Sequence, residues 1–433
     1  MAGASLGLRI CALALAFIGS ILSARLLGPS EYGIYSYVMA LIVVLGIPAQ
    51  AGIPILLVRE TSSLHAREEW GKIKGVWWWT ARAVISLSMV TGGVLVAACQ
   101  IVGNMGDLDG FWVPTLLLGA FLIPLSALGN ARAAALRGLH FNLLGQMPEY
   151  IVRPAVFAVM MLFFWGAGRD MTPPLVMSLQ VGAAAVAFMA GVVLLMRLRP
   201  QEVALSQRDV SGKHEWKKAL FPLALTSALG TLASQIGVLV AGFLTDEEAT
   251  GIYKVAISAS TLSLIGVQAV ALVSSPRIAS SFAVRDLAAL ENVASAASLA
   301  SLALVLPFFI VFVFYGEEAL YVLYGASYVS ASGSLILLTA GNFVASFFAS
   351  SNIVMIMTRN EAVSAKCLLM STALNIVLCF LLVPIMGING IAAAAAFSNL
   401  LGAGALWWIG IRKVGVDSSP LVLLKRRGGR DGR

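Results

Sequence analysis

Three arginines lie inside long apolar runs of this sequence, namely Arg9, Arg82 and Arg153, and no Asp or Glu lies deep in any such run. A guanidinium in hydrocarbon is costly unless it is paired or faces water. Because no carboxylate is available to neutralise these arginines, the pattern predicts an anion supplied from outside the protein. Phosphate fits this prediction, since the planar guanidinium fork binds phosphate oxygens bidentately.

Each of the three arginines also lies near one end of its run, with Arg82 about 9 Å deep at 1.5 Å per residue. Two further arginines, Arg59 and Arg277, close apolar runs at that same end. Long side chains at this depth also reach the membrane surface, so topology anchoring is the alternative interpretation. Their common depth favours a cationic vestibule open to the cytoplasm, and we predict all five as substrate-binding residues.

The elements that position these arginines are membrane-spanning helices. Of the 433 residues 59% are hydrophobic and only 12% are charged, about half the charged fraction of a typical soluble protein. The apolar residues form runs of about twenty, which is long enough to cross the hydrocarbon core. We therefore predict an all-α integral membrane protein with about twelve spans, at residues 5–24, 33–57, 76–102, 111–130, 149–167, 174–196, 219–243, 252–275, 293–315, 333–357, 367–386 and 390–411.

The connections between these spans alternate in charge. If the N-terminus is cytoplasmic, the inside connections and the tail hold 23 of the 29 lysines and arginines, whereas the outside connections and the outer ends of the spans hold Arg25, Arg169 and Lys254. Positive residues in short loops are retained on the cytoplasmic side. Both termini are thus predicted to be cytoplasmic.

A short internal repeat predicts two related halves. Gly33-Ile34-Tyr35 recurs as Gly251-Ile252-Tyr253, and the same offset of 218 residues carries Arg59 onto Arg277. Because six spans separate the copies, the halves are parallel repeats, as in many transporters. We predict two six-helix lobes around a central cavity, at 1–196 and 219–411, joined by a cytoplasmic linker at 197–218 and followed by a basic cytoplasmic tail at 412–433 that contacts membrane lipids.

The second span carries two Gly-Ile-Pro tripeptides, which place Pro48 and Pro54 in its inner half. Each proline removes a backbone hydrogen bond, so the helix is expected to kink there. A static kink and a hinge for alternating access are both compatible with this pattern, and we predict the hinge. Three consecutive tryptophans, Trp77 to Trp79, begin the third span, where an interfacial aromatic belt and a sugar-stacking surface are the alternatives.

Several functions are disfavoured by what the sequence lacks. The four cysteines and three histidines show no metal-ligand spacing, and we find no phosphate-binding loop, paired acids or nucleophile elbow. We expect no metal, no cofactor, no catalytic activity and no nucleic-acid partner. Any energy for transport must then come from an ion gradient, the membrane potential or consumption of the product.

Three motifs carry a family resemblance: Leu26 to Tyr35 followed by Leu56-Leu57-Val58-Arg59-Glu60, then Leu136-Arg137-Gly138, and then Asn375 through Val383 to Ala393. In these motifs the chain resembles the bacterial polysaccharide and O-antigen flippases of the multidrug, oligosaccharidyl-lipid and polysaccharide exporter superfamily. Only Arg59 of the predicted site falls on a family motif. Family members usually have a longer basic segment before the first span.

The resemblance implies a multi-pass protein of the bacterial inner membrane. It implies transfer of a polyprenyl-diphosphate-linked oligosaccharide from the cytoplasmic to the periplasmic leaflet, for O-antigen, capsule or exopolysaccharide synthesis. Membrane lipids, a polysaccharide polymerase and chain-length proteins are the partners that it suggests.

Three alternatives stay open at this point. A multidrug cation exporter of the same superfamily would share the architecture, but it would normally need intramembrane carboxylates. A membrane-bound polymerase or ligase would need a large outer loop, and the outer loops here are short. A non-transporting scaffold of the same superfamily is the third.

Overall fold

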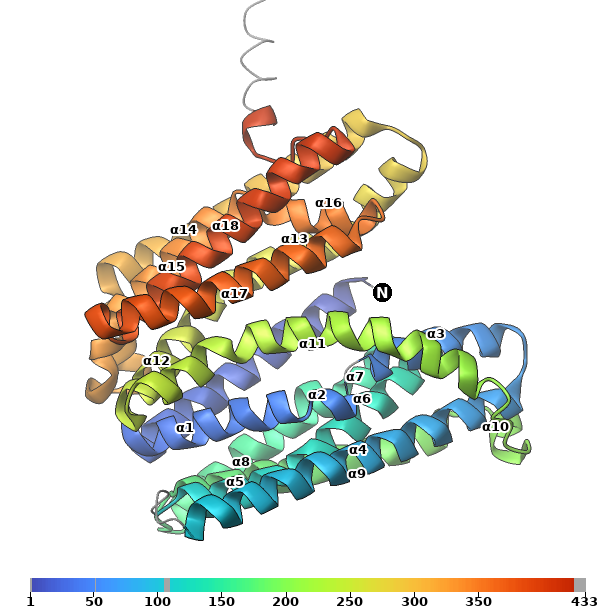
Figure 1. Cartoon of the computed structure of the whole chain (residues 1–433), viewed down its shortest axis with the longest axis horizontal. Coiled ribbons are helices and arrows are strands. Elements are labelled where there is room, and N and C mark those ends of the chain that lie inside the picture. Colours follow the sequence, from blue (N-terminus) through green and yellow to red (C-terminus); the bar gives the residue numbers. More distant parts are fainter. Residues whose placement is uncertain (1, 51, 105–109, 424–433) are drawn as a thin grey trace, which may run out of the picture. The chain divides into compact units, whose positions relative to one another are not determined.

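The computed structural model describes residues 2–50, 52–104 and 110–423, and Figure 1 shows its course. Within these ranges all the regular elements are helices. Residues 424–433 of the predicted basic tail lie outside the described part. The chain divides into two compact units, one comprising Gly3–Gln235 and the other beginning at Ile236.

Within its described residues, the first unit contains eleven helical elements and the first part of a twelfth. Their bounds are α1 Ala2–Leu45, α2 Ile47–Gln50, α3 Ile53–Ala66, α4 Trp70–Asn104, α5 Trp112–Ala120, α6 Leu122–Gly138, α7 Asn142–Met147, the π-helical turn η1 Pro148–Val152, α8 Arg153–Gly166, α9 Pro173–Leu198, α10 Gln201–Leu205 and α11 Lys213–Leu244. Helix α6 packs against α3, α4 and α9 and is the centre of this unit.

The second unit begins within α11. It continues with α12 Glu247–Ser260, the 3₁₀ turn η2 Thr261–Ser263, α13 Leu264–Ala283, α14 Leu287–Tyr324, the 3₁₀ turn η3 Ala326–Ala331, α15 Ser332–Ser346, α16 Ala349–Met357, α17 Glu361–Met386 and α18 Ile388–Val414. Helix α18 packs on α15 and α17, and the buried side chains of Tyr253, Cys379 and Ile391 belong to one apolar core.

The predicted membrane architecture is confirmed. Eleven helices of the described part are long and apolar enough to cross a membrane, and the first of them, Gly7–Leu45, covers most of the predicted span 5–24 and the first half of the predicted span 33–57. The chain turns between these spans at Gly28, whose φ of 75° and ψ of 171° lie outside the helical region. Glycine adopts a positive φ without the steric penalty that a Cβ atom brings.

Two predicted boundaries were wrong in a way that affects the site. The fourth predicted span ends at residue 130, whereas α6 continues to Gly138, and the fifth begins at residue 149, whereas its helix begins at Asn142. The polar residues near these ends resemble a connection in a hydropathy profile. They are instead helical, because the protein interior accommodates polar side chains that hydrocarbon would not.

The repeated tyrosines are buried, one in each unit. Tyr35 on α1 exposes 8% of its surface and Tyr253 on α12 exposes 1%. Tyr35 lies 6.4 Å from Tyr32, ring centre to ring centre, in a stacked arrangement. Each copy of the Gly-Ile-Tyr tripeptide therefore places a large aromatic side chain inside its unit.

Candidate functional site

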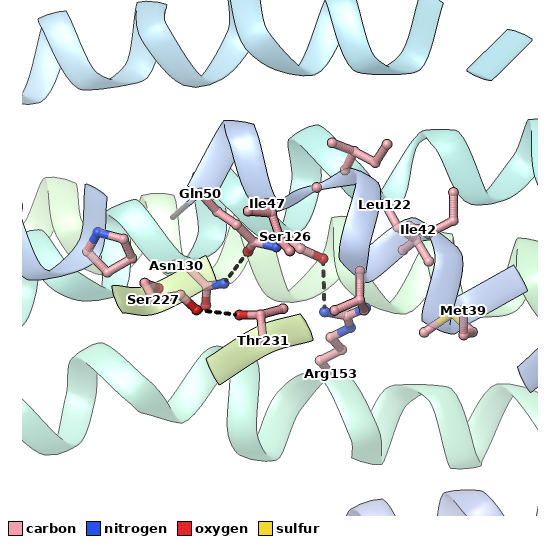
Figure 2. A pocket seen from close by; sticks show the side chains of 14 residues that line it. Met39, Ile42, Ile47, Gln50, Leu122, Ser126, Asn130, Arg153, Ser227 and Thr231 are labelled. Atoms are coloured by element: carbon pink, nitrogen blue, oxygen red, sulfur yellow. Dashed lines mark hydrogen bonds between the residues drawn. The ribbon is translucent and has the colours of Figure 1, made fainter. Parts of the chain in front are cut away.

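A polar cavity of about 480 Å³ lies within the first unit. It is bounded by the broken segment α1 to α3, by α6, by the start of α8 and by α11, and Figure 2 shows it closely. The described residues that line it are Met39, Ile42, Val43, Gly46, Ile47, Gln50, Pro54, Leu122, Ile123, Ser126, Asn130, Arg153, Ser227 and Thr231. Of these, Arg153 alone carries a charge.

Hydrogen bonds order the polar side of this cavity (Figure 2). Asn130 Nδ2 donates to Gln50 Oε1 at 3.1 Å, and Arg153 Nη1 donates to Ser126 Oγ at 3.3 Å. The amides and hydroxyls here are donors and acceptors of the kind that bind sugar or phosphate oxygens. The cavity wall therefore combines a guanidinium, amides and hydroxyls with an apolar remainder, which is the usual composition of a small-molecule site.

Arg153 belongs to a buried cluster of three charged side chains. Glu149 Oε1 lies 3.4 Å from Arg132 Nη2, and Glu149 Oε2 lies 3.7 Å from Arg153 Nη1. The side chains of Arg132, Glu149 and Arg153 expose 4%, 11% and 18% of their surface, respectively. One carboxylate thus serves two guanidiniums, and the cluster keeps an excess of one positive charge beside the cavity.

A π-helical turn places Glu149 in this cluster. The turn runs from Pro148 to Val152, between α7 and α8, and Arg153 follows it directly. Pro148 lacks a backbone N–H, and so does Pro154 at the start of α8, so the regular hydrogen-bond ladder is interrupted on both sides of the turn. Single π-helical turns of this kind occur often at functional sites.

Gly191 makes room for the Arg132 guanidinium. A Cβ atom at position 191 on α9 would lie 0.6 Å from Arg132 Nη1, so a larger residue cannot be accommodated without moving this side chain. Arg132 Nη1 also donates to the carbonyl of Ala187 at 3.3 Å, and Nη2 donates to that of Gly129 at 3.5 Å. Arg132 is therefore held by α6, α9 and the π-helical turn together.

The kink expected in the second span is confirmed. Helix α1 ends at Leu45, α2 occupies Ile47–Gln50, and α3 starts at Ile53 with Pro54 in its first turn. Gly52 has a φ of 77°, and a Cβ atom there would lie 2.6 Å from the backbone nitrogen of Ala224. Both Gly46 and Pro54 line the cavity, so the interruption forms part of its wall. The hinge role of Pro48 and Pro54 stays a prediction.

The other four predicted arginines lie on the surfaces of their units. Arg9, Arg82 and Arg277 are exposed, and Arg59 exposes 54% of its side chain and pairs with Glu60 at 2.9 Å. Arg82 lies against the Trp78 ring, 4.6 Å from its centre. Of the four predicted arginines in the first unit, Arg153 therefore lines the cavity, whereas Arg9, Arg59 and Arg82 are not among its lining residues. Their part in substrate binding stays a prediction.

The expectation that no acidic residue lies deep in a span was wrong. Glu149 sits two turns inside the helix that begins at Asn142, and it neutralises part of the charge of Arg153. The error follows from the misplaced helix start, because a glutamate at the edge of a predicted span reads as a loop residue. Arg132 was missed for the same reason at the other helix.

Comparison with known families is decisive for the class of protein. The polysaccharide biosynthesis protein family matches residues 3–282, which include the cavity, the charged cluster and the broken helix. The chain belongs to the polysaccharide biosynthesis protein family.

The chain also has a curated relative, the probable low-salt glycan biosynthesis flippase Agl15 of Haloferax volcanii. The two sequences are 23% identical over 391 residues, which cover 89% of this chain and 77% of the relative. This similarity extends well beyond the family match at residue 282.

Two of the solved structures that share the fold of this chain are a transporter and a flippase. An inward-facing multidrug resistance MATE family transporter of the MOP superfamily has a TM-score of 0.78 at 15% identity, covering 96% of this chain and 98% of that one. The lipid II flippase MurJ, in an inward closed conformation, has a TM-score of 0.74 at 14% identity, covering 94% and 86%. At such low identity the likeness establishes the fold alone.

A signal for the missed residues Glu149 and Arg132 was present in the sequence. Glu149 and Arg153 are four residues apart and flanked by Pro148 and Pro154, a spacing that places both side chains on one helical face. Gly129, one turn before Arg132, leaves space for the Glu149 carboxylate, because a Cβ atom there would lie 2.2 Å from Oε1. Only the packing of α6 against this helix turns these separate features into one cluster.

Proposed function

We propose that this protein is a flippase that transfers a polyprenyl-diphosphate-linked oligosaccharide repeat unit from the cytoplasmic to the periplasmic leaflet of a bacterial inner membrane. The product serves synthesis of O-antigen, capsule or exopolysaccharide, where a polymerase and chain-length proteins would act next. Membership of the polysaccharide biosynthesis protein family supports the pathway. The position of Arg153 on the cavity wall supports the anionic cargo.

The charge of the buried cluster carries this proposal. Two guanidiniums share one carboxylate, and Arg153 Nε is buried with no hydrogen-bond partner in the described part of the chain. A buried donor without a partner costs free energy, and a diphosphate supplies both the acceptor oxygens and the negative charge. The amide and hydroxyl groups beside Arg153 would then bind oxygens of the headgroup or of the first sugar.

Transport would follow from the broken helix in the cavity wall. Pro48 and Pro54 act as the hinge, because the helix is already interrupted between Leu45 and Ile53, so α2 can tilt without breaking a continuous helix. The lobes then expose the cavity first to the cytoplasm and then to the periplasm. The remaining arginines, Arg9, Arg59, Arg82 and Arg277, attract the anionic headgroup at the cytoplasmic surface, and the concentration of basic residues in alternate connections favours both termini on that side.

A multidrug cation exporter is the alternative, and the presence of Glu149 is the observation in its favour. A carboxylate in a membrane helix is the feature that cation binding requires. Here, however, Glu149 has two arginine partners within 4 Å, so its charge is already neutralised. A cation approaching this cluster would meet the excess positive charge, and the anionic cargo is therefore favoured.

Reconstitution of the purified protein in liposomes tests the proposal. A fluorescent polyprenyl-diphosphate oligosaccharide placed in the outer leaflet should reach the inner leaflet, measured by its protection from an externally added glycosidase. Arg153→Ala should slow this transfer at least tenfold, and Arg153→Lys should retain part of it, since a lysine keeps the charge but loses the fork. Arg197→Ala, which changes an exposed arginine of the same unit, is the control.

Two results would contradict the proposal. Equal transfer by the wild type and by Arg153→Ala would remove the cavity arginine from the mechanism. Transport of a lipophilic cation such as ethidium, with no transfer of the lipid-linked oligosaccharide, would establish the exporter instead.

A further inference from the structure

A second hollow lies on the exposed surface of the first unit, between α4 and the junction of α5 with α6. It has a volume of about 470 Å³ and is lined almost entirely by apolar atoms, including those of Ile85, Met89, Val96 and Phe121. Met89 and Phe121 expose 73% and 61% of their surface, which in a membrane-spanning helix indicates contact with lipid. This hollow, the α4 groove, is separate from the polar cavity, although both are lined by residues of α6.

Two adjacent glycines form the floor of the α4 groove. Gly92 and Gly93 line it, and a Cβ atom at either position would meet no other heavy atom within 4 Å. The second wall is interrupted where α5 ends at Ala120 and α6 begins at Leu122, which leaves the ring of Phe121 at the rim. The result is an open apolar groove along α4.

The same face of α4 carries positive charge at its beginning. At 100° per residue, Trp78 and Arg82 point in the same direction as Ile85, Met89 and Val96. Arg82 Cζ lies 4.6 Å from the centre of the Trp78 ring, and Arg208 Cζ lies 3.8 Å from the same centre. In the described part of the chain neither guanidinium forms an ion pair. Two positive charges therefore lie against the same indole ring, that of Trp78.

The linker before α11 brings Arg208 to this place. Lys74 Nζ donates to the carbonyls of Ala204 and Ser206 at 2.8 Å and 2.9 Å, and Asp209 N donates to the carbonyl of Gly71 at 3.0 Å. Gly75 permits the approach, because a Cβ atom there would lie 1.7 Å from the Asp209 carbonyl oxygen. Arg208 is therefore held against α4 because the segment that carries it is hydrogen-bonded to this helix.

We propose that the α4 groove and the Arg82 and Arg208 pair form a docking site for the polyprenyl diphosphate part of the cargo. The two guanidiniums match the two phosphates, and the apolar lining of the groove matches an isoprenoid chain. From Arg82 to Val96 the helix rises about 21 Å, enough for several isoprene units. The proposal rests on the proposed function and adds to it a capture site on the lipid side, apart from the polar cavity.

A labelling experiment with the full-length protein in nanodiscs tests the docking site. The ligand is a farnesyl diphosphate analogue with a benzophenone at the chain end, and the labelled peptides are identified by mass spectrometry. Labels on α4, α5 or α6 within the groove are expected. Gly92→Phe, which fills open space, and Arg208→Ala, which removes an exposed side chain, should each weaken binding at least tenfold. Gly404→Phe also enters open space, on α18, and is the matched control.

Three outcomes would overturn the docking site: labels elsewhere, unchanged binding in both Gly92→Phe and Arg208→Ala, or equally strong competition by phosphatidylglycerol, which would indicate a phospholipid site.

Failure of the docking site is distinguishable from failure of the proposed function. If Arg153→Ala stops transfer while Gly92→Phe transfers and binds normally, the proposed flippase function is supported and the proposed docking site is excluded. If labelling occurs in the groove but the wild type transfers no lipid-linked oligosaccharide, the docking site is supported and the proposed flippase function is excluded.

Discussion

The carboxylate of Glu149 lies 3.7 Å from the guanidinium of Arg153, one helical turn further along the chain. The same carboxylate also contacts Arg132 at 3.4 Å, so it cannot neutralise both arginines. Buried charges are tolerated only when they are paired and hydrogen-bonded. This shared carboxylate keeps Arg153 in place at the cavity wall and still leaves it short of negative charge.

Replacement of this carboxylate is expected to be strongly destabilising. Glu149→Gln would leave two buried guanidiniums without a counter-ion, and removal of one partner of a buried ion pair costs about 3–5 kcal/mol. Denaturant unfolding of the purified protein in detergent measures the loss. The double variant Glu149→Gln with Arg132→Met should recover part of it, since one uncompensated charge is removed. Glu202→Gln, on the exposed face of α10, is the control, and equal stability of Glu149→Gln and wild type would contradict the pairing.

The contact between Gly191 and Arg132 predicts a second sensitive position. Gly191→Ala places a methyl group where the Arg132 guanidinium lies, so either the side chain or α9 must move. Overpacking of this kind costs about 1–3 kcal/mol, and displacement of the charge adds to the loss. Gly166→Ala, where a Cβ atom meets no neighbour, is the matched control. In thermal unfolding, Gly191→Ala should unfold at a lower temperature than Gly166→Ala. Overlapping unfolding curves would show that the Arg132 side chain moves aside without a cost in free energy.

Gly52 should tolerate substitution less well than Gly28, although both have positive φ values of 77° and 75°. A Cβ atom at Gly28 meets no neighbour, so Gly28→Ala carries the conformational penalty alone, about 1–3 kcal/mol. At Gly52 the Cβ atom also meets the backbone of Ala224, and backbone cannot rotate away as a side chain can. A larger loss of stability in Gly52→Ala, measured by the same unfolding assay, is the expected result. The reverse order would mean that α3 and α11 separate easily.

The proposed hinge predicts a change in transport with little loss of stability. Replacing Pro48 and Pro54 together by alanine restores two backbone donors and favours a continuous helix in the cavity wall. We expect the double variant to fold normally and to transfer the lipid-linked oligosaccharide several times more slowly. Pro173→Ala, at the first position of α9, is the control proline. If the double variant transfers the lipid-linked oligosaccharide at the wild-type rate, the two prolines form a static kink and not a hinge.

The membrane architecture could be predicted from composition and spacing because hydrocarbon imposes a simple rule. A helix that crosses lipid needs a long apolar run, and every such run was visible along the chain. The kink was visible for the same reason, since the chemistry of Pro48 and Pro54 is local. Arg153 was also found, because a charged residue in an apolar run stands out without any knowledge of its neighbours.

The partners of Arg153 could not be found in this way. Arg132 is 21 positions away on another helix, and it reaches Glu149 only because Gly129 and Gly191 leave space for both side chains. The same limit applies to Arg208, which meets Trp78 only through the docking of the linker on α4.

The sequence by itself therefore determined that this protein crosses the membrane many times, where its second span breaks and which residue types are costly in lipid. Tertiary structure alone decided that Arg153 is an arginine that lines the cavity and that Glu149 is its carboxylate partner. The physical reason is that crossing lipid depends on the hydropathy of one segment, whereas pairing of buried charges depends on distances of a few ångströms between segments, which close packing sets.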